Sequence, residues 1–140
     1  MNTICVSFLL EILQGGIHRS EDNYKLALFT EGADLDQLVG GYSTFGEVKG
    51  SGYTAGGKSL PAPAFNSDEF GASMDFGQSV TWDPCSVTAR FAMIYNASRQ
   101  NRAVAVIDDG ASRTSSNGPF EVPLRSSTGP LIRLAISRPR

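Results

Sequence analysis

The chain has 140 residues, of which 41% are hydrophobic and 19% charged, and its formal net charge is −2. A chain of this length and composition is expected to fold as one globular domain over residues 1–140. So small a net charge gives no basic surface of the kind that binds nucleic acid, so we expect no nucleic-acid partner. The apolar N-terminal stretch is too short to span a bilayer and lacks the basic residues that begin a signal peptide. We therefore expect neither membrane insertion nor secretion.

The first predicted element is a short amphipathic helix over residues 7–14. Ser7 is a plausible N-cap, and Gly15-Gly16 is a typical helix end. Four apolar side chains lie at helical spacing: Phe8, Leu9, Ile12 and Leu13. Such a helix packs either on its own sheet or on a partner, and these four residues are our candidate protein interface.

The next third of the chain alternates predicted strands with turn-rich connections. Residues 24–30 are predicted to form a strand, 31–41 a loop with a helical turn at 34–39, and 42–49 a short strand. Residues 50–63 are rich in glycine and proline, and 65–75 are polar with a solvated Asp68-Glu69 pair, so both are predicted to be irregular. A strand over 76–82 should end in a turn at Asp83-Pro84.

The centre of the predicted sheet is a hairpin within residues 86–108. Its first strand is predicted to be half-buried, because apolar and other residues alternate, with the larger apolar side chains on one face. That face carries Val87, Ala89, Phe91, Met93 and Tyr95. The second strand, 103–107, is a continuous apolar run and should be buried on both faces. The polar residues 97–102 are few enough to close an antiparallel hairpin.

After Asp108-Asp109-Gly110, which we interpret as a strand end and turn rather than a calcium site, residues 112–119 are predicted to form a loop. Phe120, Val122 and Leu124 then alternate in an edge strand, because Pro123 cannot donate to a ladder. The last predicted strand is 131–137, with Ile132, Leu134 and Ile136 on one face, before a solvated basic tail at 138–140. The whole pattern predicts a mainly β, antiparallel sandwich with one short N-terminal helix.

Residues 52–59 match the phosphate-binding P-loop pattern GxxxxGKS, and Asp108 could complete a magnesium site. The context argues against a nucleotide hydrolase. The preceding residues are not an apolar strand, and Pro61 and Pro63 prevent the helix whose N-terminus would face a phosphate. We interpret the motif as a glycine-rich turn and predict no cofactor and no enzymatic activity.

Other candidate chemistry is sparse. His18, the only histidine, lies on a polar link, where a surface position is favoured although a Ser-His-Asp arrangement stays open. Cys5 and Cys85 could pair, but we interpret both as reduced and buried. No spacing of ligands predicts a metal site. Trp82, Tyr42 and Tyr53 could form a sugar-stacking surface, although a single Trp in a β protein usually packs in the core.

Three segments together resemble a family of small virion-associated structural proteins of tailed bacteriophages. They are Tyr-Lys-Leu-Ala-Leu-Phe-Thr at 24–30, Gly-Glu-Val-Lys-Gly-Ser-Gly-Tyr-Thr-Ala-Gly-Gly-Lys-Ser-Leu at 46–60, and the pair Val-Thr-Trp at 80–82 and Val-Thr-Ala-Arg-Phe-Ala-Met-Ile-Tyr-Asn at 87–96. With 103–108 and 131–134 the resemblance covers most of residues 5–136. It implies a virion location after synthesis in the host cytoplasm, repeated copies or a homo-oligomer, and other virion proteins as partners.

Within that resemblance, the size of the chain favours a capsid cement or decoration protein that binds the shell in many copies. A tail, baseplate or fibre-attachment component is the alternative, so the partner is either the major capsid protein or a tail protein. A module that binds host-surface carbohydrate is the alternative from another class.

Overall fold

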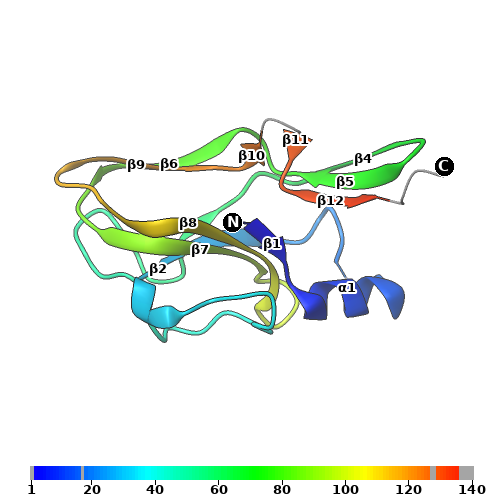
Figure 1. The fold of residues 1–140 in the computed structure, drawn as a ribbon, viewed down its shortest axis with the longest axis horizontal. Coiled ribbons are helices and arrows are strands. Elements are labelled where there is room, and N and C mark those ends of the chain that lie inside the picture. The colour runs from blue at the N-terminus through cyan, green and yellow to red at the C-terminus, as the bar shows by residue number, and fades with distance from the viewer. Residues whose placement is uncertain (1, 17, 127–128, 136–140) are drawn as a thin grey trace.

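The computed structural model describes residues 2–16, 18–126 and 129–135 of the chain. It is mainly β, its strand pairs are antiparallel, and it has one α-helix, as predicted. One layer is a sheet in the order β1 (Asn2–Ile4), β8 (Arg102–Thr114), β7 (Thr88–Asn96), β2 (Tyr24–Phe29) and β3 (Lys58–Ser59). The other layer lies above it in Figure 1 and has three small sheets. The first sheet has the order β12 (Ile132–Ala135), β5 (Gly71–Asp75) and β4 (Ala64–Asp68). The other two are the pairs β6 (Ser79–Cys85) with β9 (Gly118–Pro123) and β10 (Arg125–Ser126) with β11 (Gly129–Pro130).

The core lies between these layers, and the predicted central hairpin is its middle. Strands β7 and β8 pair directly, and residues 103–107 are buried on both faces, which confirms that prediction. The prediction of a half-buried first strand is wrong, because Ala92, Ile94 and Asn96 are buried as fully as Met93 and Tyr95. The 31–48 connection covers the face of β7 that carries Met93 and Tyr95, and Tyr42 stacks on Tyr95 with ring centroids 4.5 Å apart. The opposite face is covered as well: Asn96 is paired with Tyr24 of β2, whose ring packs on Phe76 with centroids 5.2 Å apart.

Several strands extend beyond, or lie outside, their predicted limits. Strand β8 continues to Thr114, so the turn predicted at 108–110 and the start of the loop at 112 are wrong. A register shift between Ala89 and Phe91, with Gly110 at φ +82°, lets β8 bulge and continue. Strand β6 likewise passes through the cis Asp83-Pro84 bond to Cys85, where a turn was predicted. Among the described strands, β9 pairs with β6 alone, as an edge strand ending at Pro123 should.

The segment 65–75 was predicted to be irregular, yet it forms the β4–β5 hairpin that projects beside α1 (Figure 1). Asp68 accepts the Phe70 N–H at 2.9 Å in the turn, and Arg133 of β12 bridges Asp68 at 2.9 Å. The Asp68-Glu69 pair is exposed, as predicted. The pattern was missed because β4 is exposed along its whole length, so no apolar alternation marks it.

Three further short elements differ from prediction. Strand β1 was not predicted, and it pairs with the edge of β8. The helical turn is a 3₁₀ helix, η1, at Glu31–Ala33 rather than at 34–39. Residues 42–49 contain no strand, only an isolated bridge between Glu47 and Phe29. Ile136 and the basic tail lie outside the described residues, whereas Ile132 is buried and Leu134 is 37% exposed.

Helix α1 (Val6–Leu13) begins one residue earlier than predicted, with Cys5 rather than Ser7 at its N-cap position. Ser7 is inside the helix, and its buried Oγ has no hydrogen-bond partner among the described residues. Gly15 and Gly16, both at positive φ, follow its end as expected. With eight residues α1 is far shorter than a helix that crosses a bilayer. No helix in the described ranges is long and apolar enough to do so.

Candidate functional site

The predicted interface residues on α1 divide between the core and the surface. Phe8 is buried, and Leu9 and Ile12 are half-buried, so of the two alternatives these three residues follow the first and pack within the chain. Only Leu13, 84% exposed, faces outward. It shares the outward side of the helix with two residues that the sequence reading missed: Val6 and Leu10, 49% and 53% exposed. We call Val6, Leu10 and Leu13 the outward helix face.

The outward helix face is held in place by contacts on the inner side of α1. The pairing of β1 with β8 and a 3.0 Å hydrogen bond from the Cys5 N–H to the Val104 carbonyl anchor its beginning. The Val6 N–H donates to the Gln37 carbonyl at 2.8 Å. Three apolar side chains therefore face water on a backbone that is fixed before any partner arrives.

An apolar groove of about 250 Å³ runs between α1 and the β4–β5–β12 sheet. The side chains that line it include Phe8 and Ile12 from the helix, and Phe65 and Leu134 from the sheet. Phe65 is 53% exposed, so apolar surface continues from the groove onto the outside of the sheet. The helix and the projecting sheet thus bring exposed apolar groups to one end of the molecule (Figure 1).

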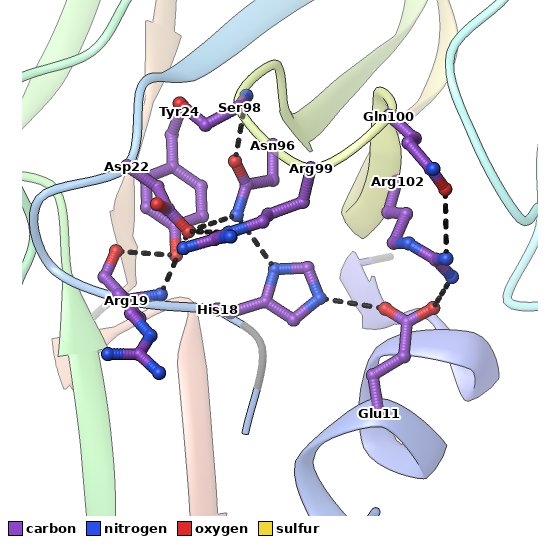
Figure 2. A network of polar contacts seen from close by, with 10 residues as sticks. All are labelled: Glu11, His18, Arg19, Asp22, Tyr24, Asn96, Ser98, Arg99, Gln100 and Arg102. Atoms are coloured by element: carbon purple, nitrogen blue, oxygen red, sulfur yellow. Dashed lines mark hydrogen bonds and ion pairs between the residues drawn. The ribbon is translucent and has the colours of Figure 1, made fainter. Parts of the chain in front are cut away.

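A polar network, drawn in Figure 2, adjoins this groove at His18, which is one of the lining residues. We call it the histidine cluster, and its members are Glu11, His18, Asp22, Asn96, Arg99 and Arg102. The His18 side chain is only 2% exposed, so the favoured surface position for this histidine is wrong. Its Nε2 lies 2.7 Å from Glu11 Oε1, and Arg102 donates to the other Glu11 oxygen at 2.8 Å. The Glu11 carboxylate therefore links α1 to the start of β8, with His18 on one of its oxygens and Arg102 on the other.

The other half of the histidine cluster joins the segment before β2 to the end of β7. Asp22 Oδ2 accepts three hydrogen bonds, from Asn96 Nδ2 at 2.9 Å, from Arg99 Nε at 3.1 Å and from the Arg19 N–H at 3.1 Å (Figure 2). Burial alone would raise the pKa of Asp22, but these donors outweigh it and lower the pKa below its usual value. Asp22 is thus a carboxylate at neutral pH.

A second buried carboxylate, Glu47, organises the glycine-rich segment. Its oxygens accept hydrogen bonds from the hydroxyls of Tyr42 at 2.6 Å and Tyr53 at 2.5 Å, and from the Gly56 N–H at 2.8 Å. Tyr95 donates to the Gly56 carbonyl at 2.5 Å. We call Tyr42, Glu47, Tyr53, Gly56 and Tyr95 the tyrosine cluster. Among the described residues Glu47 forms no ion pair.

The tyrosine cluster gives the P-loop-like motif a different geometry from a phosphate loop. A side-chain carboxylate already accepts the Gly56 N–H, and Lys58 and Ser59 form strand β3 instead of starting a helix. Lys58 Nζ donates to the Thr81 carbonyl at 2.5 Å and lies 5.5 Å from the Trp82 ring. Gly57 has φ +81°, and a Cβ there would overlap the Leu26 carbonyl, so the motif's glycines allow close packing on β2.

The remaining candidates are placed as follows. Trp82 is 2% exposed and packs in the core, which is the position we favoured over a sugar-stacking surface. Cys5 and Cys85 are both buried and free, as predicted, and burial raises the pKa of Cys5 to about 12. No group of three or more metal-ligating side chains is found in the described ranges. Asp108 binds Arg90 at 3.0 Å.

The sequence reading did not find either cluster. Asn96 lies 78 residues from His18, and Glu11 lies on the helix that was interpreted as an apolar interface. The available signal was the polar Asn96 at the end of an otherwise apolar run, since a polar group there needs a buried partner. Comparisons with known proteins add no relative: no family model, curated protein or solved structure matches the chain.

Proposed function

We propose that this chain is a structural protein of a tailed-bacteriophage virion, a cement or decoration protein that docks on the capsid shell in many copies. The outward helix face carries the proposal. An eight-residue α1 whose residues Val6, Leu10 and Leu13 face water is apolar surface without an intramolecular partner among the described residues. Contiguous exposed apolar surface on a small protein is typical of a protein interface.

The dimensions of this surface favour a repeated partner. Eight helical residues extend about 12 Å, so even with the adjoining groove the contact is smaller than the roughly 800 Å² per partner of a stable interface. One such contact is weak, but many copies on a symmetric lattice, or one subunit that contacts two neighbours, gain avidity without new contacts. The family resemblance of residues 24–30, 46–60, 80–82 and 87–96 supports a phage particle as that lattice.

The test is binding of the purified chain to particles that lack it, with bound copies counted by quantitative mass spectrometry. A Leu10→Gln, Leu13→Gln double variant removes most of the outward helix face while keeping good helix formers. Phe45→Gln is the matched control, because Phe45 is also 73% exposed but lies in the turn beside η1. Both variants should melt like the wild type, since exposed substitutions rarely change stability by more than about 0.5 kcal/mol.

We expect the wild type and Phe45→Gln to bind in hundreds of copies, and the double variant to lose binding at least about tenfold. Equal binding by the double variant would reject the outward helix face as the docking surface. A copy number of about a dozen or fewer would replace the shell with the tail, baseplate or fibre as the location. Absence of the chain from particles would reject a virion role.

A further inference from the structure

We propose that the histidine cluster is a pH-sensitive latch: neutral His18 holds α1 and the segment before β2 on the central sheet, and protonated His18 releases them. This inference does not depend on the proposed function. It rests on which atoms of the cluster can donate and which can accept a hydrogen bond.

The orientation of the Asn96 amide is fixed by two partners that cannot change roles. The backbone N–H of Ser98 can only donate, and it faces Asn96 Oδ1 at 3.1 Å. The ionised carboxylate of Asp22 can only accept, and it faces Asn96 Nδ2 at 2.9 Å. Rotating the amide by half a turn would set donor against donor and acceptor against acceptor. Asn96 Nδ2 therefore also points its second hydrogen at His18, 3.1 Å from the ring (Figure 2).

The Asn96 amide in turn selects the proton position on His18. The ring nitrogen that it faces is Nδ1, which must accept and therefore carries no hydrogen. The other nitrogen, Nε2, lies 2.7 Å from Glu11 Oε1 and donates to it. Only the neutral, Nε2-protonated form satisfies both contacts. A second proton would place an N–H on Nδ1, directly against the N–H of Asn96.

The charged groups around His18 do not by themselves reverse the preference for the neutral, Nε2-protonated ring. Five titratable or charged side chains surround the His18 ring. Two are carboxylates, Glu11 from α1 and Asp22 from the segment before β2. The others are Tyr24 from β2, Arg99 from the β7–β8 turn and Arg102 from β8. Each carboxylate already has a guanidinium partner, Arg102 on Glu11 at 2.8 Å and Arg99 on Asp22 at 3.1 Å. The two carboxylates and two guanidinium groups balance, which leaves the hydrogen-bond pattern to decide the form of His18.

Breaking the His18–Asn96 contact would remove one of the two side-chain attachments that hold Glu11 of α1 to the sheet, and would leave Arg102 and the backbone hydrogen bond of Cys5 at the start of the helix. Phe8, whose ring lies 4.8 Å from His18, and Ile12 would then leave the groove that they line. Imidazole is the side chain whose charge mild acid changes most readily, so mild acid is the stimulus. The predicted outcome is local release of α1 while the β7–β8 hairpin stays folded.

The test uses NMR of the ¹⁵N-labelled chain, whose single histidine gives unambiguous ring signals. At pH 7.5 a long-range ¹H–¹⁵N spectrum should report the neutral Nε2-protonated form. Hydrogen exchange of the α1 amides, corrected for intrinsic pH dependence, should lose protection at least about tenfold between pH 7.5 and 5.5. The amides of Ile94 and Val106 serve as the internal reference and should change little. In His18→Gln the protection of α1 should no longer depend on pH in this range.

Three results would overturn the latch. The first is a charged or Nδ1-protonated ring at pH 7.5, which is measured on the wild type and decides the matter even if His18→Gln does not fold. The second is pH-independent protection of α1 in the wild type. The third is the same loss of protection in His18→Gln, which would assign the effect to Glu11 and Asp22.

Discussion

The histidine cluster and the tyrosine cluster both bury a carboxylate against the central sheet, but they satisfy it with different donors. Glu47 accepts two phenols and one backbone N–H, all neutral. Burial, together with the hydrogen bond to Glu47, raises the pKa of Tyr42 and of Tyr53 above the usual value, so both phenols stay protonated. Glu11 instead accepts an imidazole and a guanidinium. The neutral donors on Glu47 hold the glycine-rich segment in a way that does not depend on their protonation. The imidazole on Glu11 makes the attachment of α1 depend on the protonation state of the ring.

The largest predicted effect is on the sheet that the two clusters share. Phe91 is buried in the middle of β7, so Phe91→Ala should lower the free energy of unfolding by about 3–5 kcal/mol through lost burial and a cavity. Urea unfolding at pH 7 measures this, and both clusters should be weakened together. A loss below about 1 kcal/mol would mean that the side chain is not part of the core.

Removing the carboxylate of the tyrosine cluster should come next. Glu47→Ala leaves the Gly56 N–H and two half-buried phenols without their acceptor, at a cost of about 3 kcal/mol. Limited proteolysis should then cut within residues 50–59, while α1 stays protected. Tyr53→Phe is the milder companion and should cost about 1 kcal/mol, because it removes only one donor. Equal protease resistance in Glu47→Ala would contradict the role given to this carboxylate.

Within the histidine cluster, Asp22→Asn should cost about 2 kcal/mol at pH 7, because three donors lose a charged acceptor. The folded pKa of Asp22 lies below its unfolded value of 3.8, so its contribution is complete above that pH and is lost as the pH falls through the folded value. The stability difference between wild type and variant should therefore shrink only below about pH 4. A difference that already disappears at pH 6 would contradict this assignment.

The smallest change in stability is expected for a substitution of Lys58. This substitution tests whether Lys58 is a turn residue or a phosphate ligand. Lys58 is exposed, and Lys58→Ala removes one hydrogen bond to Thr81 and a contact with Trp82. The expected loss is about 0.5 kcal/mol in urea unfolding. Micromolar ATP binding by the wild type, absent in the variant, would instead restore the P-loop interpretation.

The spacing of apolar residues along the chain predicted those strands and helices whose own sequence is apolar enough to show that they are buried. Strands β2 and β7 and the buried run 103–107 are apolar enough to be recognised locally. Strand β4 was missed because its ladder depends on β5 and not on buried side chains. Helical spacing located α1 but not its outward side, because Phe8 and Leu13 are equally apolar and only the position of the sheet separates them. His18 was missed because its partners come from distant segments.

The contrast between the two clusters is tested most directly by the free energy of unfolding at pH 8 and pH 5. The wild type, His18→Gln and Glu47→Gln would be compared by urea titration. The account predicts that the wild type and Glu47→Gln lose stability on acidification in parallel, whereas His18→Gln loses much less. A pH dependence that survives in His18→Gln, or one that disappears in Glu47→Gln, would contradict the account.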